Sequence, residues 1–246
     1  MRRLSLIVGF TVLAGTWATP PMLVPGSHEL QSTRITEECD SSWFVSRDPG
    51  ETTEHALLGQ RKEHHLVTDQ RGSTVVQVTT LTSPNGSYID STVMLRDGLA
   101  PISEATHAGP QVIRYRDDRN HVDVTTTNGD SAPSVTHHEY AYSLFNFEEL
   151  DLLMRLLPLR PGYQALLPLY SEGDQDAEID TVQVEGKDRA GVWQVRFADK
   201  AIVATYGVSD HTRGLVSYSH RFRVDGPRWK AGTVWRQAFR ACGQRR

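Results

Sequence analysis

The stretch that decides the fold is NFEELDLLMRLLPLRPGYQALLPLY, residues 146–170. Four of its apolar side chains recur with the period of a helix and form one stripe: Leu150, Leu153, Met154 and Leu157. Asn146 is a favourable N-cap, and acidic residues follow in the first turn, where they complement the helix dipole. Because Pro158 has no backbone N–H to donate, we expect a helix over residues 146–157 and an apolar loop over residues 163–170.

Most of the remaining chain has the pattern of strands joined by tight turns. Residues 73–82, STVVQVTTLT, are rich in β-branched residues, and the Asn85-Gly86 pair that follows favours a hairpin turn. Similar segments recur between residues 87 and 140 and between residues 178 and 224. Because hairpin turns join antiparallel strands, this pattern excludes an alternating α/β fold. We expect a mainly β protein in which a curved antiparallel sheet, a half-barrel, wraps around one amphipathic helix.

The first residues, MRRLSLIVGFTVLAGTWA, have the pattern of a secretory signal peptide over residues 1–18. Arg2 and Arg3 precede an apolar run that is shorter than the roughly 18 to 20 residues needed to span a bilayer. Small residues precede a cleavage point after Ala18. An uncleaved membrane anchor is the alternative. We therefore expect an exported protein, either periplasmic or extracellular.

Beyond the signal peptide, the sequence divides into three regions. We expect a linker with short elements over residues 19–61, the half-barrel over residues 62–225, and a basic C-terminal tail over residues 226–246. The aromatic and basic residues of the tail favour contact with an anionic membrane surface, and a solvated tail is the alternative. These residues are Arg228, Trp229, Lys230, Trp235, Arg236, Arg240, Arg245 and Arg246.

The net charge and the cysteines restrict the partners and the compartment. A net charge of -4 gives no electrostatic basis for binding nucleic acid. The two cysteines are Cys39 and Cys242, and an even number in an exported chain favours a disulfide. Such a disulfide would tie the N-terminal region to the tail; two free thiols are the alternative.

Motifs for metal binding or catalysis are weak. The histidine pairs His64-His65 and His137-His138 lie in strand-like segments, where adjacent side chains point to opposite faces, so each pair offers one ligand at most. The Gly-Asp-Ser sequence at residues 129–131 lacks the strand-to-helix context of a serine hydrolase elbow. We therefore expect no metal, no cofactor and no catalytic residue.

The apolar residues of the helix and of the loop after it are the candidates for ligand contact: Leu150, Leu153, Met154, Leu157, Tyr163, Leu166, Leu167 and Tyr170. The alternative for the same residues is plain core packing. Burial of four leucine-sized side chains contributes about 6–12 kcal/mol, which is sufficient to hold the helix in place without a ligand.

Residues 152–170, the VQVEG strand at residues 182–186, and the next strand with Trp193 and Val195 resemble a group of bacterial envelope proteins. This group is related to the domain of unknown function 3108 and, more distantly, to the LolA and LppX lipoprotein-carrier fold. The resemblance implies a strongly curved antiparallel half-barrel around the helix. Relatives of that architecture carry acyl chains or lipids, so the resemblance implies, by analogy of fold, a hydrophobic ligand.

We therefore expect a non-enzymatic protein that binds or carries a lipid or acyl chain between the sheet and the helix, where apolar contact replaces water. One alternative is an envelope structural or assembly factor that binds another protein. A second alternative is a hydrolase. A carrier needs a cavity, an assembly factor needs an exposed apolar patch, and a hydrolase needs polar side chains that converge in a cleft.

Overall fold

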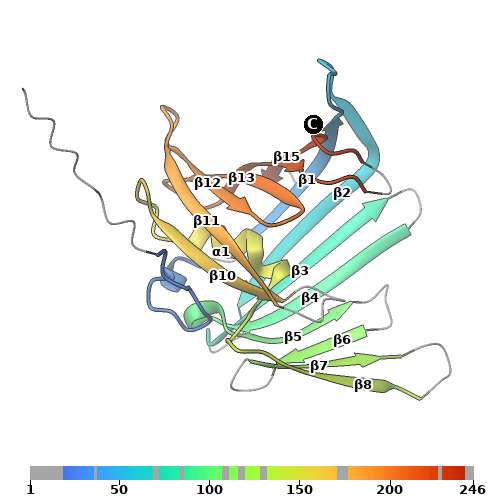
Figure 1. The fold of residues 1–246 in the computed structure, drawn as a ribbon, viewed down its shortest axis with the longest axis vertical. Coiled ribbons are helices and arrows are strands. Elements are labelled where there is room, and N and C mark those ends of the chain that lie inside the picture. The colour runs from blue at the N-terminus through green and yellow to red at the C-terminus, as the bar shows by residue number, and fades with distance from the viewer. Residues whose placement is uncertain are drawn as a thin grey trace, which may run out of the picture.

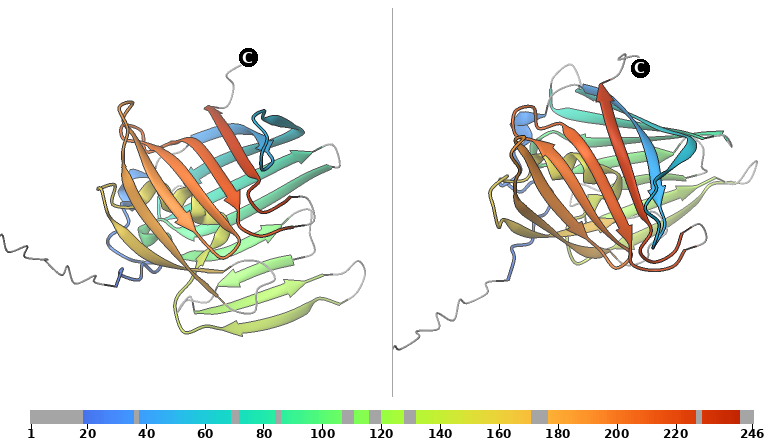
Figure 2. Two further views of the ribbon diagram at one scale, coloured as in Figure 1. Left: turned by 45° about the horizontal axis from the view of Figure 1, so that its top comes forward. Right: turned by 90° about the horizontal axis from the view of Figure 1, so that it is seen from above.

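The fold, seen in a computed structural model, is one sheet of 15 strands curled around a short helix (Figure 1). The structure describes residues 19–35, 38–68, 72–83, 86–106, 111–115, 120–127, 132–170, 177–226 and 229–241. The strand order is β8-β7-β6-β5-β4-β3-β2-β1-β15-β14-β13-β12-β11-β10-β9, so the last strand of the chain lies beside the first. The sheet is nearly closed and barrel-like, which confirms the predicted half-barrel around a helix (Figure 2).

The strands of the first half are β1 (Glu38–Arg47), β2 (His55–Thr68), β3 (Thr74–Ser83), β4 (Gly86–Leu95), β5 (Pro101–Thr106), β6 (Gln111–Tyr115), β7 (His121–Thr126) and β8 (Ser134–Glu139). Those of the second half are β9 (Phe145–Asn146), β10 (Gln164–Tyr170), β11 (Glu178–Lys187), β12 (Val192–Ala198), β13 (Ile202–Ser209), β14 (Leu215–Phe222) and β15 (Val234–Ala241). The helices are η1 (Ser32–Arg34), η2 (Asp97–Leu99), η3 (Phe147–Glu149) and α1 (Leu150–Leu156). The short β9 pairs in parallel with β10.

The predicted helix is present, in two parts. Asn146 is the N-cap, as expected, and its side chain accepts a hydrogen bond of 2.7 Å from the backbone N–H of Glu148. The first turn is the 3-10 helix η3, and the α-helix α1 follows it. Leu157 has left the helix, with ψ at 154°, because the ring of the following Pro158 disfavours helical backbone at the residue before it.

The prediction of an apolar loop over residues 163–170 is wrong, because Gln164–Tyr170 forms strand β10. Ala165, Leu167 and Leu169 alternate into the core and are at most 2% exposed. The residues between them, Leu166 and Pro168, are apolar as well. The stretch therefore lacks the alternation of apolar and polar residues that identifies a half-buried strand.

The prediction of a linker with short elements over residues 19–61 is corrected as well, because the elements here are long strands of the sheet. Strands β1 and β2 extend the sheet into this region, and residues 19–35, here called the N-terminal strap, pack against the barrel. Its side chains Leu23, Leu30 and Ile35 are at most 5% exposed. Its backbone binds two distant elements, since Gly26 N–H donates to Gly98 and Gln31 N–H donates to Leu156, each at 2.9 Å. The apolar residues of the strap are isolated in a polar segment and follow neither the helix nor the strand period. The sequence therefore could not show that the strap packs against the barrel.

The predicted basic tail over residues 226–246 contains a central strand. The prediction of a tail is therefore wrong for this part. β15 lies between β1 and β14, with Val234 opposite both Arg47 and Arg221. β15 contains Arg236, Gln237 and Arg240 among its apolar residues, so its sequence resembles a basic tail. The partner strand β1 lies about 190 residues earlier in the chain, so local sequence did not indicate the pairing. Residues 242–246 lie outside the described residues.

The two edges of the sheet approach each other through a small apolar cluster: Val122, Val124, Tyr140, Leu144 and Tyr170. The ring of Tyr140, just after β8, meets the ring of Tyr170 at the end of β10 edge-on, with 6.1 Å between the centroids. The larger core cluster joins α1 and the strap to β2, β3, β4 and η2 as well as to the strands β10 to β13. The helix therefore packs against both halves of the sheet inside the barrel (Figure 2).

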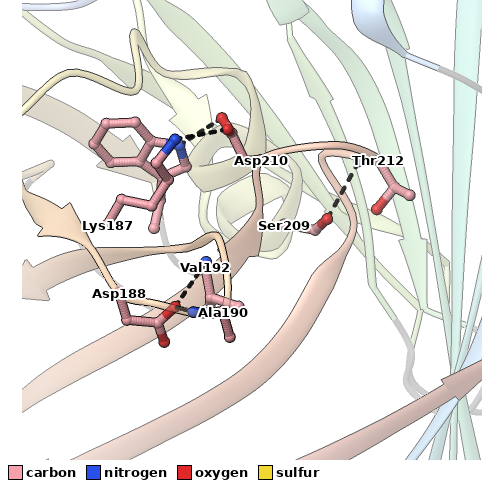
Figure 3. Close-up of polar contacts among 8 residues, drawn as sticks. Lys187, Asp188, Ala190, Val192, Ser209, Asp210 and Thr212 are labelled. Atoms are coloured by element: carbon pink, nitrogen blue, oxygen red, sulfur yellow. Dashed lines mark hydrogen bonds and ion pairs between the residues drawn. The ribbon is translucent and has the colours of Figure 1, made fainter.

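Two hairpin turns at the same end of the barrel are tied together, as Figure 3 shows. Asp210, after β13, accepts a hydrogen bond from Lys187 Nζ and another from Trp193 Nε1, each at 2.8 Å. The Lys187 hydrogen bond lowers the pKa of Asp210 to about 2, so Asp210 is ionised at neutral pH. Within the β11–β12 turn, Asp188 Oδ1 accepts from the backbone N–H groups of Ala190 and Val192.

Candidate ligand-binding site

The structure gathers the predicted ligand-contact residues into protein core. Six of them belong to the main core cluster, where each is at most 5% exposed: Leu150, Leu153, Met154, Leu157, Tyr163 and Leu167. Tyr170 belongs to the smaller cluster at the sheet edges, and Leu166 is half-buried beside the strap. The plain packing that the sequence left open accounts for these positions, and their contact with a ligand stays a prediction.

A row of aromatic side chains continues from this core along the inner face of β13, β14 and β15. It consists of Tyr206, Tyr218, His220, Phe222, Trp229 and Trp235, here called the aromatic row. Neighbouring rings are close along its whole length, with centroids 4.8 Å apart for Tyr206–Tyr218 and 4.3 Å apart for the stacked Phe222–Trp229. Separations of this size are those of aromatic pairs in protein cores.

Strand geometry places the row on the inner face. Residues i and i+2 of a strand share a face, so Tyr218, His220 and Phe222 of β14 point the same way. Tyr218 packs against the main core cluster, to which Tyr206 belongs. The start of β14 lies close to α1, because Arg213 contacts the end of that helix, and the row therefore extends away from the helix along β14.

The exposed fractions change along the row. Tyr206 and Phe222 are buried, at 2% and 7% exposed. Tyr218, His220, Trp229 and Trp235 are half-buried. The half-buried rings carry a large apolar surface that the protein covers only in part, which is the kind of surface that apolar ligands use.

The row is uncharged at neutral pH. Burial lowers the pKa of His220 to about 4, so the imidazole is neutral, and its Nδ1 lies 2.9 Å from Tyr218 Oη. Burial also raises the pKa of both Tyr206 and Tyr218. Among the described residues, the indole Nε1 of Trp229 is buried without a hydrogen-bond partner. A buried donor without a partner is costly, and an acceptor oxygen on a ligand would satisfy it.

The opposite inner wall is polar and acidic where it faces the start of the helix. Asp90, Glu104 and Glu149 are at most 4% exposed, and Asn146 Nδ2 donates to Glu104 Oε2. Burial, with repulsion from Asp90, raises the pKa of Glu104, so this carboxyl keeps its proton at neutral pH. Burial raises the pKa of Glu149 in the same direction. The raised pKa values favour the neutral form of Glu104 and Glu149, and within the described residues both carboxyl oxygens of Glu149 are buried without a hydrogen-bond partner.

Of the predicted cysteine pair, the structure describes Cys39, which lies in β1. Cys39 is disulfide-bonded, and its Sγ lies 3.5 Å from His65 Nε2. Cys242 lies outside the described residues, so the pairing itself stays a prediction. The register of the two strands supports it, because Asp40 is opposite Ala241, one residue from each cysteine. The described residues contain no group of three His, Cys, Asp or Glu side chains placed to hold a metal ion.

Sequence reasoning missed the aromatic row. Trp229 and Trp235 were predicted to lie in a tail, and the alternation Tyr218-x-His220-x-Phe222 was seen as part of a strand without an assigned face. That alternation was a usable signal, because three ring side chains at i, i+2 and i+4 must share one face of a sheet. The acidic wall had no such signal, since Asp90 and Glu104 come from different strands.

The sequence matches the family described as "Protein of unknown function (DUF3108)" over residues 50–229. The chain belongs to this family. The matched residues begin before β2 and end at Trp229, so they include the inner acidic wall and most of the aromatic row. Among curated proteins, none matches the chain. The DUF3108 assignment confirms the predicted family and leaves the ligand to be argued from the structure. Among the described residues, no helix is long and apolar enough to cross a membrane.

Proposed function

We propose that the protein is a non-enzymatic binding or carrier protein for a hydrophobic ligand, a lipid or acyl chain, held inside the half-barrel. The observation that carries this proposal is the aromatic row, whose half-buried rings Tyr218, His220, Trp229 and Trp235 form an uncharged surface beyond the helix. Covering such a surface with an acyl chain removes apolar area from water, at about 25 cal/mol per Å².

The ligand position proposed here extends the one expected from sequence. The helix stripe is packed against protein, whereas the aromatic row begins at the same core and runs along β14. An acyl chain would therefore lie along the aromatic row, and its methyl end would reach the main core cluster.

Export, and the distant relationship to the LolA and LppX carrier fold, are parts of the same proposal. The signal-like pattern of residues 1–18, which lie outside the described residues, supports export, and the disulfide at Cys39 is typical of an oxidising compartment. The half-barrel around a helix supports the relationship to the carrier fold. Membrane contact through the C-terminal residues also remains a proposal.

A second candidate function, an assembly factor that binds another protein, is favoured by one feature. Strand β8 is at the edge of the sheet, and most of its residues are exposed, with Val135 at 51%. An exposed edge strand presents unpaired backbone groups that another chain can bind by adding a strand.

The test measures binding of palmitate to the full chain by native mass spectrometry, together with lipid extraction from protein purified out of an envelope fraction. Trp229→Ser with Trp235→Ser should abolish palmitate uptake. The matched control is Trp43→Ser. Trp43 is also half-buried, but its position in β1 puts it on the outer face.

A second experiment measures contact directly. A brominated stearate should quench the fluorescence of Trp229 and Trp235 in a variant with Trp17, Trp43 and Trp193 each replaced by Phe, because bromine quenches only at contact. A wild-type protein that copurifies without lipid and takes up no palmitate would overturn the carrier proposal in favour of the assembly factor.

A further inference from the structure

The outer face of the sheet carries a groove lined by arginines. Its volume is about 390 Å³, and it crosses β12, β13, β14, β15 and β1. Four guanidinium groups line it: Arg47, Arg196, Arg221 and Arg236. The hydroxyl groups of Thr205 and Ser219 line it as well. We call this surface the arginine groove.

Strand pairing explains why residues so far apart in sequence meet here. Arg196 is opposite Thr205, Thr205 is opposite Ser219, and Ser219 is opposite Arg236, so these four form one row across the sheet. In the neighbouring row on the same face, Val234 has Arg221 on one side and Arg47 on the other. Arginines therefore lie at the ends of the patch. The hydroxyl side chains of Thr205 and Ser219 and the aliphatic side chain of Val234 lie between them.

Alternation along the strands separates this groove from the inner site. In β12, Val195 and Phe197 are buried in the core, so Arg196 between them points outward. In β13, Ala204 and Tyr206 are buried in the same way, so Thr205 points outward. The arginines of the groove and the rings of the aromatic row therefore lie on opposite faces of the same strands, although His220 of the row also borders the groove.

The charge of the groove is largely uncompensated. Arg236 forms an ion pair with Glu54, in which Nη1 and Oε1 are 2.5 Å apart. Within the part of the chain that the structure describes, Arg47, Arg196 and Arg221 have no ion-pair or hydrogen-bond partner for their guanidinium groups. Three guanidiniums without partners surround the centre of one patch, in a chain whose net charge is -4, and an anion bound at that centre would offset their mutual repulsion.

We propose that the arginine groove is a binding site for a phosphate group, with the guanidinium groups of Arg196, Arg221 and Arg47 and the hydroxyls of Thr205 and Ser219 as donors. Guanidinium groups match phosphate oxygens with paired N–H donors, and hydroxyl groups complete the shell of an oxyanion. A phosphate can come from a soluble phosphate monoester or from a lipid headgroup. This site goes beyond the hydrophobic ligand proposed for the inner face and does not depend on it.

The test uses the full chain and two probes at low ionic strength, where charge–charge attraction is least screened. The first probe is glycerol 3-phosphate, measured by isothermal titration calorimetry against sodium chloride of equal ionic strength. The second is phosphatidylcholine vesicles with and without phosphatidylglycerol, measured by co-sedimentation. The groove variant is R196Q with R221Q. The matched control is R160Q with R189Q, which removes two exposed arginines that do not line the groove.

Loss of two charge-assisted contacts should weaken binding of at least one probe by about tenfold or more in the groove variant. The control should stay within about twofold of the unmodified chain. A loss seen with glycerol 3-phosphate assigns a soluble ligand, and a loss confined to anionic vesicles assigns a headgroup. Binding that falls equally in both variants, or no binding of either probe, would overturn the proposal. Melting temperatures equal to that of the unmodified chain establish that both variants are folded.

Discussion

Arg155 of helix α1 and Arg213 of the β13–β14 turn each donate a hydrogen bond to the backbone carbonyl of the other, at 2.7 Å and 3.3 Å respectively. Arg213 Nη1 also donates to the carbonyl of Leu157, and its Nη2 donates to Gln31 Oε1 of the strap. A buried cation therefore satisfies the C-terminal carbonyl groups of the helix, which have no partner within the helix itself. This pair joins helix, strap and sheet at one point.

Replacing Arg213 by Met should therefore destabilise the whole barrel. The variant keeps the apolar stem but leaves the carbonyls of Arg155 and Leu157 without this donor, and we expect a loss of about 2–4 kcal/mol in the free energy of unfolding. Urea denaturation measures it. The control Arg189→Met removes an exposed arginine of the β11–β12 turn and should change the free energy by less than about 0.5 kcal/mol. An equal effect of both substitutions would contradict the joining role.

The close approach of Gly98 to Gly26 gives a test of the N-terminal strap. A Cβ added at Gly98 would lie 2.2 Å from the Cα of Gly26. Gly98→Ala should therefore displace the strap and make residues 19–35 sensitive to protease.

Gly162→Ala is the matched control for this test. Both glycines have positive φ, 68° and 76°, but a Cβ at Gly162 would meet no atom within 4 Å. The control should show only the backbone strain, about 1–2 kcal/mol, and no new cleavage in the strap. Protection of the strap in the Gly98→Ala variant would mean that its contact with η2 does not hold it in place.

The buried Glu104 predicts a particular dependence of stability on pH. Its pKa in the folded protein lies above the ordinary value of 4.5, chiefly because of burial. The folded state therefore holds a proton that the unfolded chain releases, so the stabilisation is complete below pH 4.5 and declines as the pH rises above it.

Glu104→Gln, which mimics the protonated acid, should remove this decline, which amounts to at most about 1.4 kcal/mol per pH unit for one proton. Urea denaturation at pH 5 and pH 8 compares the two proteins. The variant should gain relative to the unmodified chain as the pH rises. The exposed Glu185→Gln, on β11, serves as the control and should leave the pH dependence unchanged. Parallel curves for Glu104→Gln and the unmodified chain would show that Glu104 is already ionised in the folded state.

We expect the disulfide partner of Cys39 to be Cys242. The disulfide should stabilise the pairing of β1 with β15. Replacing both cysteines by Ser should lower the free energy of unfolding by about 2–5 kcal/mol, as for other native disulfides. Intact mass after alkylation without reductant should show no modified thiol in the unmodified chain. Alkylation of Cys242 in that experiment would refute the pairing.

The sequence alone determined the class of fold, because strand and helix periods are local properties. The stripe from Leu150 to Leu157, the N-cap Asn146 and the run of hairpin patterns were sufficient for a curved sheet around one helix. The family came from another source, the resemblance of residues 152–170 and 182–186 to the DUF3108 group, and the match over residues 50–229 confirms it. It also found residues that meet in the core, although their role as ligand contacts stays a prediction.

The tertiary structure alone decided which strands are neighbours and which face each side chain occupies. β15 lies beside β1 although nearly the whole chain separates them, and the strap reaches the helix end through scattered contacts. The aromatic row and the arginine groove both follow from that pairing, since alternating residues of β12 to β15 are sorted onto opposite faces. Sequence patterns record the period of a segment, but not its partner, because the partner is chosen by the packing of the whole sheet.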